Sequence, residues 1–283
     1  MDLPLIGRKD AVLDGITGFV EHYDFALANS SYKARVHAVT KVASICYQSP
    51  KALDSVSLFN RLQAESAGLP SSSYEFVPVL LKVSVILDGI TINPYTSNCL
   101  KFGEFVESEQ YLLTNLRALI EDVGPEESLN YLNTDPAEQQ IIRDNFKVFL
   151  FNVDVPTRTQ MIRHRVSWQE LSRRYVSGKK SPFNFYISKK IKAISAYFTK
   201  NNNGIDTEME DYVDLGIQLY DAAIANGVKP EEARRILPQA MLTTIWGAFQ
   251  PSQLESYFTL RLDKHAQREI RQVSEAMQEL IHA

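Results

Sequence analysis

The sequence contains little of what metal, redox and secreted proteins require. Its two cysteines, Cys46 and Cys99, cannot form a disulfide framework and lie outside any CxxC pattern. None of the five histidines belongs to an HxxH or HxxxH pair of the kind that binds zinc, so we predict no metal site. The GxGxxG motif and the P-loop pattern are also absent, which leaves no support for a Rossmann dinucleotide site or a P-loop.

The chain also lacks long hydrophobic runs and a large excess of one charge. No apolar run is long enough to cross a bilayer, and the first ten residues show no basic stretch followed by an apolar one. We therefore expect a cytoplasmic protein without a secretory signal or a membrane partner. A formal net charge of −4 disfavours a general nucleic-acid binder. With 45% hydrophobic residues, the chain of 283 residues can bury a large core.

Against this acidic background, four arginines and one histidine lie within residues 163–174. Guanidinium groups suit phosphate because they donate two parallel charge-assisted hydrogen bonds to it. The interleaved Ser167, Gln169 and Glu170 can hydrogen-bond a polar ring. One interpretation is a pocket for a phosphorylated, hydrogen-bonding small molecule. The other is a solvated helix face with Arg–Glu pairs, and composition alone gives the two equal weight.

Residue patterns predict a mixed α and β domain of the α+β class. Apolar residues at helical spacing indicate helices over 33–48, 54–67 and 207–226, and alternation over 146–155 indicates a strand. Residues 76–92 fit either a strand pair or a buried helix. The buried side of the helix over 207–226 is expected to comprise Tyr212, Val213, Leu219, Tyr220 and Ala223. We also expect mostly helical sequence over 103–145, a short strand over 183–187 and a surface loop over 201–204. More helix is expected after Leu237-Pro238, and one long helix from about 252 to 281.

A second cluster of candidate functional residues lies near the C-terminus. Arg261 and His265 are four residues apart in the expected last helix and would share one face. Neighbouring apolar residues would hold Arg261 in a semi-buried place, where an unpaired guanidinium is costly. A surface ion pair is the alternative, and spacing favours it. Arg234-Arg235 can likewise be the solvated end of a helix. If the protein is an enzyme, we expect a bound cofactor to supply the reactive atoms.

Taken in order, these segments resemble the flavin-dependent thymidylate synthases, the ThyX family. The family pattern RHRxxSxNExSxRY is similar to Arg163-His164-Arg165 followed by residues 167–175, with one residue fewer between RHR and Ser172. The patterns ARxxLP and LRxDxHAQxEI are present at 233–238 and 260–270. Residues 42–47 and 72–76 resemble the family segments ARVSF or ARVCY and TPFEH.

The resemblance implies a single catalytic domain over residues 1–283, with a mostly helical insertion at about 85–145 and a helical C-terminal half. It also implies a homotetramer whose active sites are built between subunits. The reaction would be reductive methylation of dUMP to dTMP, with FAD as cofactor and NADPH and methylenetetrahydrofolate as co-substrates. No enzyme nucleophile would attack the pyrimidine.

Carried over by position, Arg261 has the catalytic role. It would lie at the uracil and favour the N3-ionised ring, because a fixed cation stabilises negative charge in a water-poor site. Ser172 would orient the substrate. The implied dUMP-binding residues are Gln160, Arg163, Glu170, Leu171, Ser172, Arg173, Arg174, Arg234 and Arg261. The implied FAD-binding residues are Ser72, Arg163, His164, Arg165, Gln250, Ser252 and Ser256.

The chain departs from the family pattern on the flavin side. Pro70 stands where the family has a histidine, and Gln250, Ser252 and Ser256 stand where it has flavin-contacting Asn and Arg residues. Two alternatives therefore stay open. One is an enzyme that acts on UMP or makes a hydroxymethyl product, and the other is a homologue that binds nucleotide without turnover. An RNA-binding module is the least favoured, because the cations lie in three short motifs.

Overall fold

The protein folds around an antiparallel sheet of five strands in the order β1-β2-β6-β10-β7. The computed structural model describes residues 3–15, 17–64, 68–84, 96–192, 195–200 and 203–283. The strands of the central sheet are β1 (Leu5–Leu13), β2 (Thr17–Tyr23), β6 (Lys147–Asp154), β7 (Ser167–Glu170) and β10 (Leu242–Phe249).

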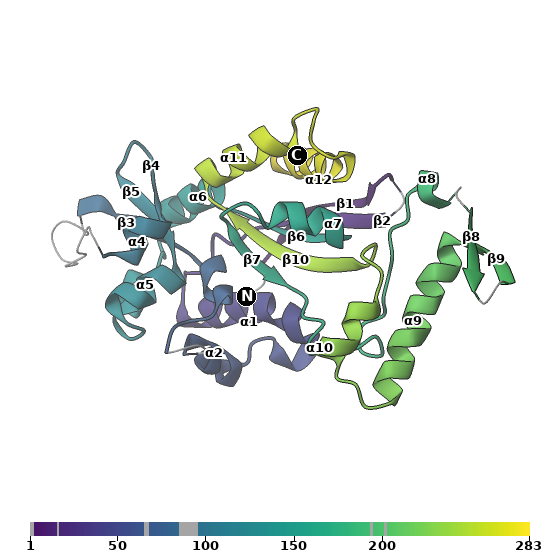
Figure 1. Cartoon of the computed structure of the whole chain (residues 1–283). Helices are drawn as coiled ribbons and strands as arrows, with labels where there is room; N and C mark the ends of the chain where they lie inside the picture. The colour runs from purple at the N-terminus through teal and green to yellow at the C-terminus, as the bar shows by residue number, and fades with distance from the viewer. Residues whose placement is uncertain (1–2, 16, 65–67, 85–95, 193–194, 201–202) are drawn as a thin grey trace.

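Period-two alternation divides the side chains of β6 and β10 between the two faces of this sheet. Phe149 and Phe249 lie in the apolar cluster with the C-terminal helices, whereas Val148 and Trp246 lie in the cluster with α1. Figure 1 shows α11 and α12 on one side of the sheet and α1 on the other. The covering helices are α1 (Tyr32–Tyr47), α7 (Val155–Met161), α11 (Pro251–Arg261) and α12 (Arg268–His282). The strand predicted over 146–155 and the helix predicted over 33–48 are confirmed.

A smaller sheet of three strands, in the order β3-β5-β4, lies beside the central one. The mostly helical character predicted for 103–145 is therefore wrong over 104–115, where β4 and β5 form a hairpin. Its turn takes three consecutive residues into left-handed backbone, with φ of 52°, 51° and 65° at Glu107, Ser108 and Glu109. The elements of this part are β3 (Pro78–Lys82), α4 (Asn98–Phe102), β4 (Glu104–Val106), β5 (Tyr111–Asn115), α5 (Leu116–Val123), η3 (Glu127–Tyr131) and α6 (Pro136–Asn145).

Residues 76–92 were predicted to form either a strand pair or a buried helix. The structure has the strand β3 up to Lys82, and residues 85–95 lie outside the described part of the chain. The helix predicted over 54–67 is α2 (Val56–Gln63), and residues 65–67 again lie outside that part. The remaining short elements before residue 200 are η1 (Pro50–Ala52), η2 (Ser72–Phe76), α8 (Lys189–Lys192) and β8 (Ser195–Lys200).

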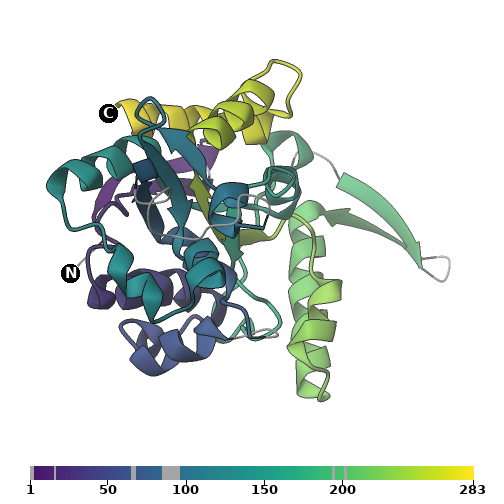
Figure 2. The ribbon, with the colours of Figure 1, turned by 90° about the vertical axis from the view of Figure 1, so that its left-hand side faces the viewer.

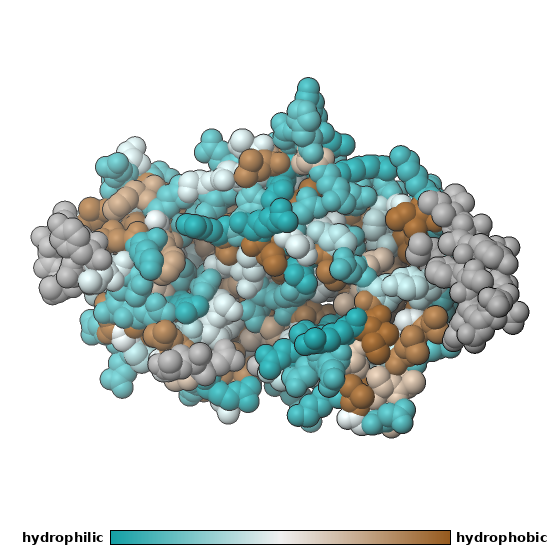
Figure 3. Space-filling view, in the orientation of Figure 1, coloured by the Kyte–Doolittle hydropathy of each residue, from teal (hydrophilic) through white to brown (hydrophobic). Residues whose placement is uncertain are grey.

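The helix predicted over 207–226 is α9 (Met209–Ala225), which Figure 2 shows beside the projecting hairpin of β8 and β9 (Asn203–Glu208). Val213 and Tyr220 are buried as predicted, but Tyr212 and Leu219 are 50% and 49% exposed. Together with Leu215 they form an apolar stripe on the outer face of α9, and Figure 3 shows apolar surface over this helix. The loop predicted over 201–204 is contradicted at 203–204, which begin β9, and 201–202 are not described. No described helix has both the length and the apolar character needed to cross a bilayer.

Three further predictions for the C-terminal half are wrong. The sequence after Leu237-Pro238 forms β10, because its Thr, Ile, Trp and Phe side chains favour a strand. Residues 183–187 make only an isolated bridge between Phe185 and Met241. The long helix expected over 252–281 is two helices, because the Asp263 side chain accepts from the backbone N–H of His265 over 2.7 Å and forms a turn. With β7 to β10, the C-terminal half is not uniformly helical.

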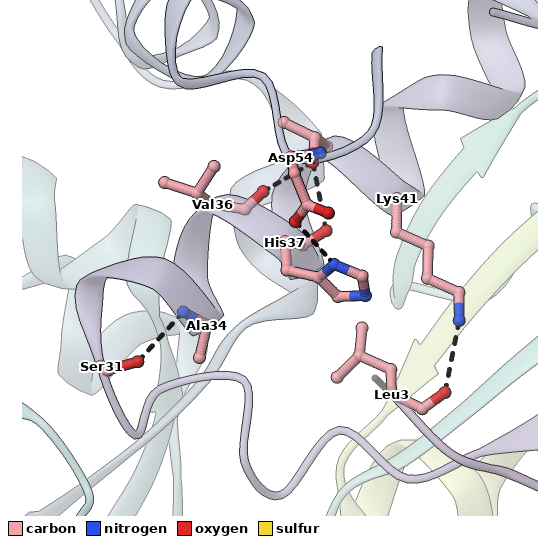
Figure 4. A network of polar contacts seen from close by, with 8 residues as sticks. Leu3, Ser31, Ala34, Val36, His37, Lys41 and Asp54 are labelled. Atoms are coloured by element: carbon pink, nitrogen blue, oxygen red, sulfur yellow. Dashed lines mark hydrogen bonds and ion pairs between the residues drawn. The ribbon is translucent and has the colours of Figure 1, made fainter. Parts of the chain in front are cut away.

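Polar contacts hold α1 beside the sheet (Figure 4). His37 Nδ1 lies 2.8 Å from Asp54 Oδ1, and the backbone N–H of Asp54 donates to Thr40 Oγ1 over 3.0 Å. Lys41 Nζ donates to the carbonyl oxygen of Leu3 over 3.3 Å. These contacts tie α1 to the N-terminal segment and to the turn before α2, and so fix the helix that packs against β7.

Gly247 allows β7 to pack closely on β10. It lies opposite Trp168 in the strand pairing, and a Cβ at this position would lie 2.6 Å from Trp168 Cζ3. The indole ring thus occupies the space that a side chain would take. Trp168 also packs edge-on against Phe249, so the glycine helps to fix the strand that follows the RHR segment.

We expect Gly247→Ala to lower the free energy of unfolding by about 1–3 kcal/mol, because the added methyl group overpacks the sheet. Urea unfolding followed by circular dichroism measures this change. Ser57→Ala, at an exposed position of α2, is the control and should change stability by less than about 0.5 kcal/mol. A Gly247→Ala protein as stable as the parent would contradict the close packing of Trp168 on β10.

Candidate active site

The RHR segment forms the turn between α7 and β7. The Asp154 side chain caps α7 by accepting from the backbone N–H of Thr157, and the helix ends at Met161. The backbone N–H of His164 then donates to the carbonyl oxygen of Met161 over 3.1 Å, which tightens the turn. Residues 163–174 are thus a turn, a strand and a loop, and the alternative of a solvated helix face is wrong.

The RHR segment and the C-terminal family motif meet in space. Arg261, the last residue of α11, donates from Nε to His164 Nε2 over 2.7 Å and from Nη2 to the carbonyl oxygen of Gln160 over 2.9 Å. Burial lowers the pKa of Arg261, and the charge of the exposed neighbour Arg163 lowers it further. His265 does not share a helical face with Arg261, because it lies in the loop after α11.

His164 is held as a hydrogen-bond acceptor. Its ring lies 4.7 Å from the ring of buried Tyr257, and its carbonyl oxygen accepts from Trp168 Nε1 over 3.1 Å. Burial and then the neighbouring Arg261 charge lower the pKa of His164. A neutral imidazole has a lone pair for the Arg261 Nε–H, whereas a protonated one has none. The contact therefore requires the neutral ring.

Arg174 and Arg234 line a second site, a pocket of about 460 Å³. All its lining residues are charged: Arg174, Glu231, Glu232, Arg234 and Arg235. Arg174 Nε lies 3.7 Å from Glu231 Oε2, and Arg234 Nε donates to the Glu231 carbonyl oxygen over 3.2 Å. The arginines come from the loop after β7 and from η4 (Arg234–Ile236), which follows α10 (Pro230–Ala233). Three guanidinium groups around one pocket suit a phosphate.

The other residues predicted to bind nucleotide occupy varied environments. Glu170 accepts from Thr243 Oγ1 over 2.9 Å and lies 3.1 Å from Arg158 Nε. Leu171 is buried in the core, and the Ser172 side chain accepts weakly from the Arg174 backbone N–H over 3.4 Å.

Arg173 differs from its neighbour Arg174 because it is buried. It is 7% exposed, donates to the carbonyl oxygen of Ser181 over 2.7 Å, and lies 4.7 Å from the ring centroid of Phe183. Burial lowers the pKa of Arg173. In one chain, this side chain holds the turn at 177–182 and does not line the arginine pocket.

Gln169, whose side chain was expected to hydrogen-bond a polar ring, instead links three elements. Its amide nitrogen donates to Cys46 Sγ of α1 over 2.7 Å, and its amide oxygen accepts from Ser72 Oγ of η2. Cys46 Sγ in turn donates to the carbonyl oxygen of Glu170 over 3.1 Å. The predicted flavin residue Ser72 therefore lies against β7.

A larger cavity of about 870 Å³ lies where the smaller sheet meets the N-terminal end of α11. It is lined by Arg165, Gln250 and Ser252 among others. Gln250 is buried and donates to the carbonyl oxygens of Phe102 and Leu113. Ser256 is exposed on α11 and does not line this cavity.

The predicted residues thus gather in three places of one chain. His164, Gln160 and Arg261 are in contact, Arg174 and Arg234 share a pocket, and Arg165, Gln250 and Ser252 share a cavity. Arg174, Arg234 and Arg261, which the resemblance assigns to one dUMP site, do not line one pocket within one chain, because the lining of the arginine pocket does not include Arg261. Figure 1 shows α11 and α10 on opposite sides of the central sheet.

Sequence reasoning missed Arg235 as a pocket residue. It was interpreted together with Arg234 as a possible solvated helix end, but both side chains line the same pocket. Arg234 and Arg235 are exposed and follow the end of α10, so the local sequence fits a solvated helix end as well as a pocket wall. Their position next to Arg174 depends on tertiary contacts that no local pattern contains.

This fold and these sites define a mixed α+β protein whose clustered guanidinium groups suit a ligand that carries phosphate. Residues 129–283, more than half of the chain, match the family described as thymidylate synthase complementing protein, and the chain belongs to this family. The matched residues include α7, the RHR turn, β7, the arginine pocket and Arg261. The match begins inside the segment predicted to be an insertion, and that insertion stays a prediction.

Three relatives are each named flavin-dependent thymidylate synthase. The protein of Aquifex aeolicus is 30% identical over 149 residues, which are 48% of this chain and 45% of the relative. That of Pyrococcus furiosus is 33% identical over 137 residues, 46% of this chain and 53% of the relative. That of Thermotoga neapolitana is 31% identical over 133 residues, 46% of this chain and 59% of the relative. The chain thus spans about half the length of the curated relatives it matches.

The contact between His164 and Arg261 predicts a pH-dependent stability. The folded pKa of His164 is lowered, so the unfolded chain takes up a proton first as the pH falls below the ordinary value of about 6.5. Stability from this group is therefore present above pH 6.5 and is lost as the pH falls towards the folded pKa. His164→Gln keeps an acceptor for Arg261 but cannot titrate.

We expect His164→Gln to be within about 1 kcal/mol of the parent at pH 7.5. The parent should then lose stability relative to the variant at pH 6.5 and 5.5, as measured by urea unfolding. His22, whose pKa burial also lowers, is present in both proteins and cancels in the difference. A difference in unfolding free energy that does not change with pH would show that His164 is not held neutral by Arg261.

Proposed function

We propose that this protein is a flavin-dependent thymidylate synthase that converts dUMP to dTMP by reductive methylation, with FAD as cofactor and methylenetetrahydrofolate and NADPH as co-substrates. The observation that carries the proposal is the contact of Arg261 with His164, which joins the RHR motif and the C-terminal family motif at one place. The matched family and the relatives' names support the same reaction.

The arginine pocket suits the phosphate of a nucleoside monophosphate. Arg174, Arg234 and Arg235 line it and can surround a phosphate group with charge-assisted hydrogen bonds. Glu231 and Glu232 line the same pocket and limit its net positive charge. A pocket with three arginines and two glutamates favours a singly phosphorylated ligand over a more highly charged one.

Arg261 is proposed to act on the pyrimidine ring. His164 and the Gln160 carbonyl orient its guanidinium, which leaves Nη1 and the outer edge for a ligand. A fixed cation at the ring stabilises negative charge as N3 loses its proton, and so makes C5 more nucleophilic. Glu170 and Ser172 are proposed to orient the nucleotide beside it.

The cavity beside Arg165 fits a flavin in size and lining. Its volume of about 870 Å³ lies within the usual range for cofactor pockets, and apolar side chains such as Phe102, Phe146 and Val166 can contact an aromatic ring. FAD, when bound and reduced, supplies the reducing equivalents for the methyl group. Arg165 is proposed to contact the cofactor, while Ser72 is proposed to do so from η2.

A shared active site explains why Arg261 lies apart from the arginine pocket in one chain. We propose that a second copy brings its pocket to the Arg261 side, within a homotetramer. The exposed stripe of Tyr212, Leu215 and Leu219 on α9 supports this, because exposed apolar patches favour association. Helix α9 packs against η4, so burial of the stripe would place the pocket near a subunit interface.

The proposed reaction can be tested with the purified protein. We expect a flavin absorption spectrum after addition of FAD, and release of tritium from C5 of dUMP in the presence of NADPH and methylenetetrahydrofolate. The product mass separates a methyl product from a hydroxymethyl product, and UMP tests the requirement for deoxyribose. Absence of both flavin binding and C5 exchange would end the proposal.

Shared sites predict complementation between inactive variants. Arg174→Gln and Arg261→Gln should each lower turnover, by about 10-fold or more for a lost charge-assisted contact and by about 100-fold for a lost transition-state contact. Co-expression of the two should restore activity at about a quarter of the sites, because random assembly gives that fraction two intact halves. Tritium release from co-purified, differently tagged chains measures it.

The matched control is co-expression of Arg174→Gln with Arg234→Gln. These two residues line the same pocket of one chain, so no mixed site is intact and activity should stay at the level of the single variants. Restored activity in this control would rule out sites divided between the pocket and Arg261. A lack of restored activity when Arg174→Gln and Arg261→Gln are co-expressed would also rule them out.

A further inference from the structure

The buried face of α9 lies against both segments that form the arginine pocket. Val213, Gly216 and Tyr220 follow one another at spacings of three and four residues, so they share this face, and all three are buried. One wall of the pocket is the loop after β7, which carries Arg174, and the other is α10 with η4, which carries Arg234. Helix α9 contacts α10 and η4 and lies beside them (Figure 1).

Tyr220 connects α9 to the first wall through aromatic packing. Its ring centroid lies 4.9 Å from that of Phe183, at an interplanar angle of 84°. The other neighbour of the Phe183 ring is Arg173, whose Cζ lies 4.7 Å from the ring centroid. Phe183 therefore packs between a residue of α9 and the residue that precedes Arg174 in the chain. The position of Arg174 is tied to α9 by these two contacts.

Gly216 allows α9 to approach the second wall closely. A Cβ on this glycine would lie 2.9 Å from Pro238 Cδ and 3.2 Å from Pro238 Cγ, whereas the next atom, the carbonyl oxygen of Ile236, would be 3.8 Å away. The proline ring is rigid and cannot turn aside as a flexible side chain does. Glycine is unfavourable inside a helix relative to alanine, and the close approach of Pro238 accounts for it here. Pro238 lies just beyond η4, so this contact ties the second wall to α9.

The guanidinium groups of the two walls flank a single residue. Arg174 Nε lies 3.7 Å from Glu231 Oε2, and Arg234 Nε donates to the Glu231 carbonyl oxygen over 3.2 Å. Charge-assisted hydrogen bonds depend on donor distance and direction, so two such groups can share one phosphate only at a matching separation. The element that holds both walls therefore controls how well the pocket fits this anion.

We propose that Gly216 is a positioning residue for the phosphate. Its contact with Pro238 sets the place of Arg234 relative to Arg174, which the packing of Tyr220 on Phe183 holds from the same face of α9. The inference rests on the proposed function, which places the phosphate of a nucleotide in the arginine pocket.

Gly216→Ala tests the contact. The added methyl group must move α9 or the second wall by about 0.5 Å, because 2.9 Å has to become an ordinary contact of about 3.4 Å. The variant should fold, because alanine favours the helix. Isothermal titration with inorganic phosphate and with dUMP measures the affinity. We expect both ligands to bind about 10-fold more weakly, because misplacing binding groups by about 1 Å can cost about 100-fold.

Turnover separates a positioning role from a loss of folded protein. In Gly216→Ala the KM for dUMP should rise by the same factor as the dissociation constant, with kcat unchanged, because phosphate binding is weakened equally in the ground state and the transition state. A loss of folded protein alone would lower kcat and leave KM unchanged, and that result would overturn the inference.

Pro238→Ala provides a rescue, because it removes both ring atoms that the new methyl group would meet. The double variant Gly216→Ala/Pro238→Ala should bind phosphate as tightly as Pro238→Ala alone, which closes a double-mutant cycle. Gln218→Ala, at an exposed position of the same helix, is the matched control and should bind phosphate like the parent. Equal phosphate affinity of Gly216→Ala and the parent would overturn the inference. A loss that persists in the double variant would do so as well.

The inference and the proposed function fail in different ways. If the parent binds phosphate and dUMP and Gly216→Ala does not weaken them, the inference alone fails. If Gly216→Ala weakens both ligands but the parent neither binds flavin nor releases tritium from dUMP, the flavin enzyme is ruled out and the positioning role stands. If the parent binds neither phosphate nor dUMP, both are overturned.

Discussion

The pairing of β10 with strands on both of its sides is the constraint on which the candidate site depends. β10 pairs with β6 from Leu242 to Phe249 and with β7 from Ile245 to Ala248. The first pairing fixes the strand that leads into α7, and the second fixes the strand that follows the RHR turn. Both ends of the turn are therefore held by one strand. The same strand runs into α11, whose last residue is Arg261, so the contact of Arg261 with His164 follows from the sheet.

Arginines serve two physical roles in this chain, and burial separates them. Arg35 is 2% exposed and donates to Asn29 and Ser128, and burial lowers its pKa to about 10. Arg173 is likewise buried against carbonyl oxygens. Most donors of these two groups are satisfied within the fold, because an unpaired buried charge is costly, although Arg173 Nε has no partner among the described residues. Arg174 and Arg234 are exposed and keep donors available for a ligand. Burial thus separates the arginines that hold the fold from Arg174 and Arg234, which are proposed to bind a phosphate.

Local patterns predicted the helices α1 and α9 and the strand β6, because their apolar spacing continues over many residues. They failed over 104–115, where the left-handed turn at Glu107 to Glu109 contains no glycine to mark it. They also failed at Asp263, whose side chain ends one helix through a contact only two residues away. Motif identity found Arg261 and His164, but not that Arg173 and Arg174 differ in burial. That difference depends on the turn at 177–182, which only the tertiary structure brings to Arg173.

The boundary of the family match runs through the largest of the three candidate sites. Arg165 and Ser252 lie within the matched residues, whereas Lys101, Glu104 and Arg117 lie before them. A residue carried over by position keeps its role only where its neighbours are also kept. Ser252 has a neighbour from outside the matched residues in Glu104, whose carboxylate occupies the Ser252 donors at the start of α11. The chemistry of this cavity is therefore decided by contacts between the two parts of the chain, and a motif comparison of either part alone does not contain it.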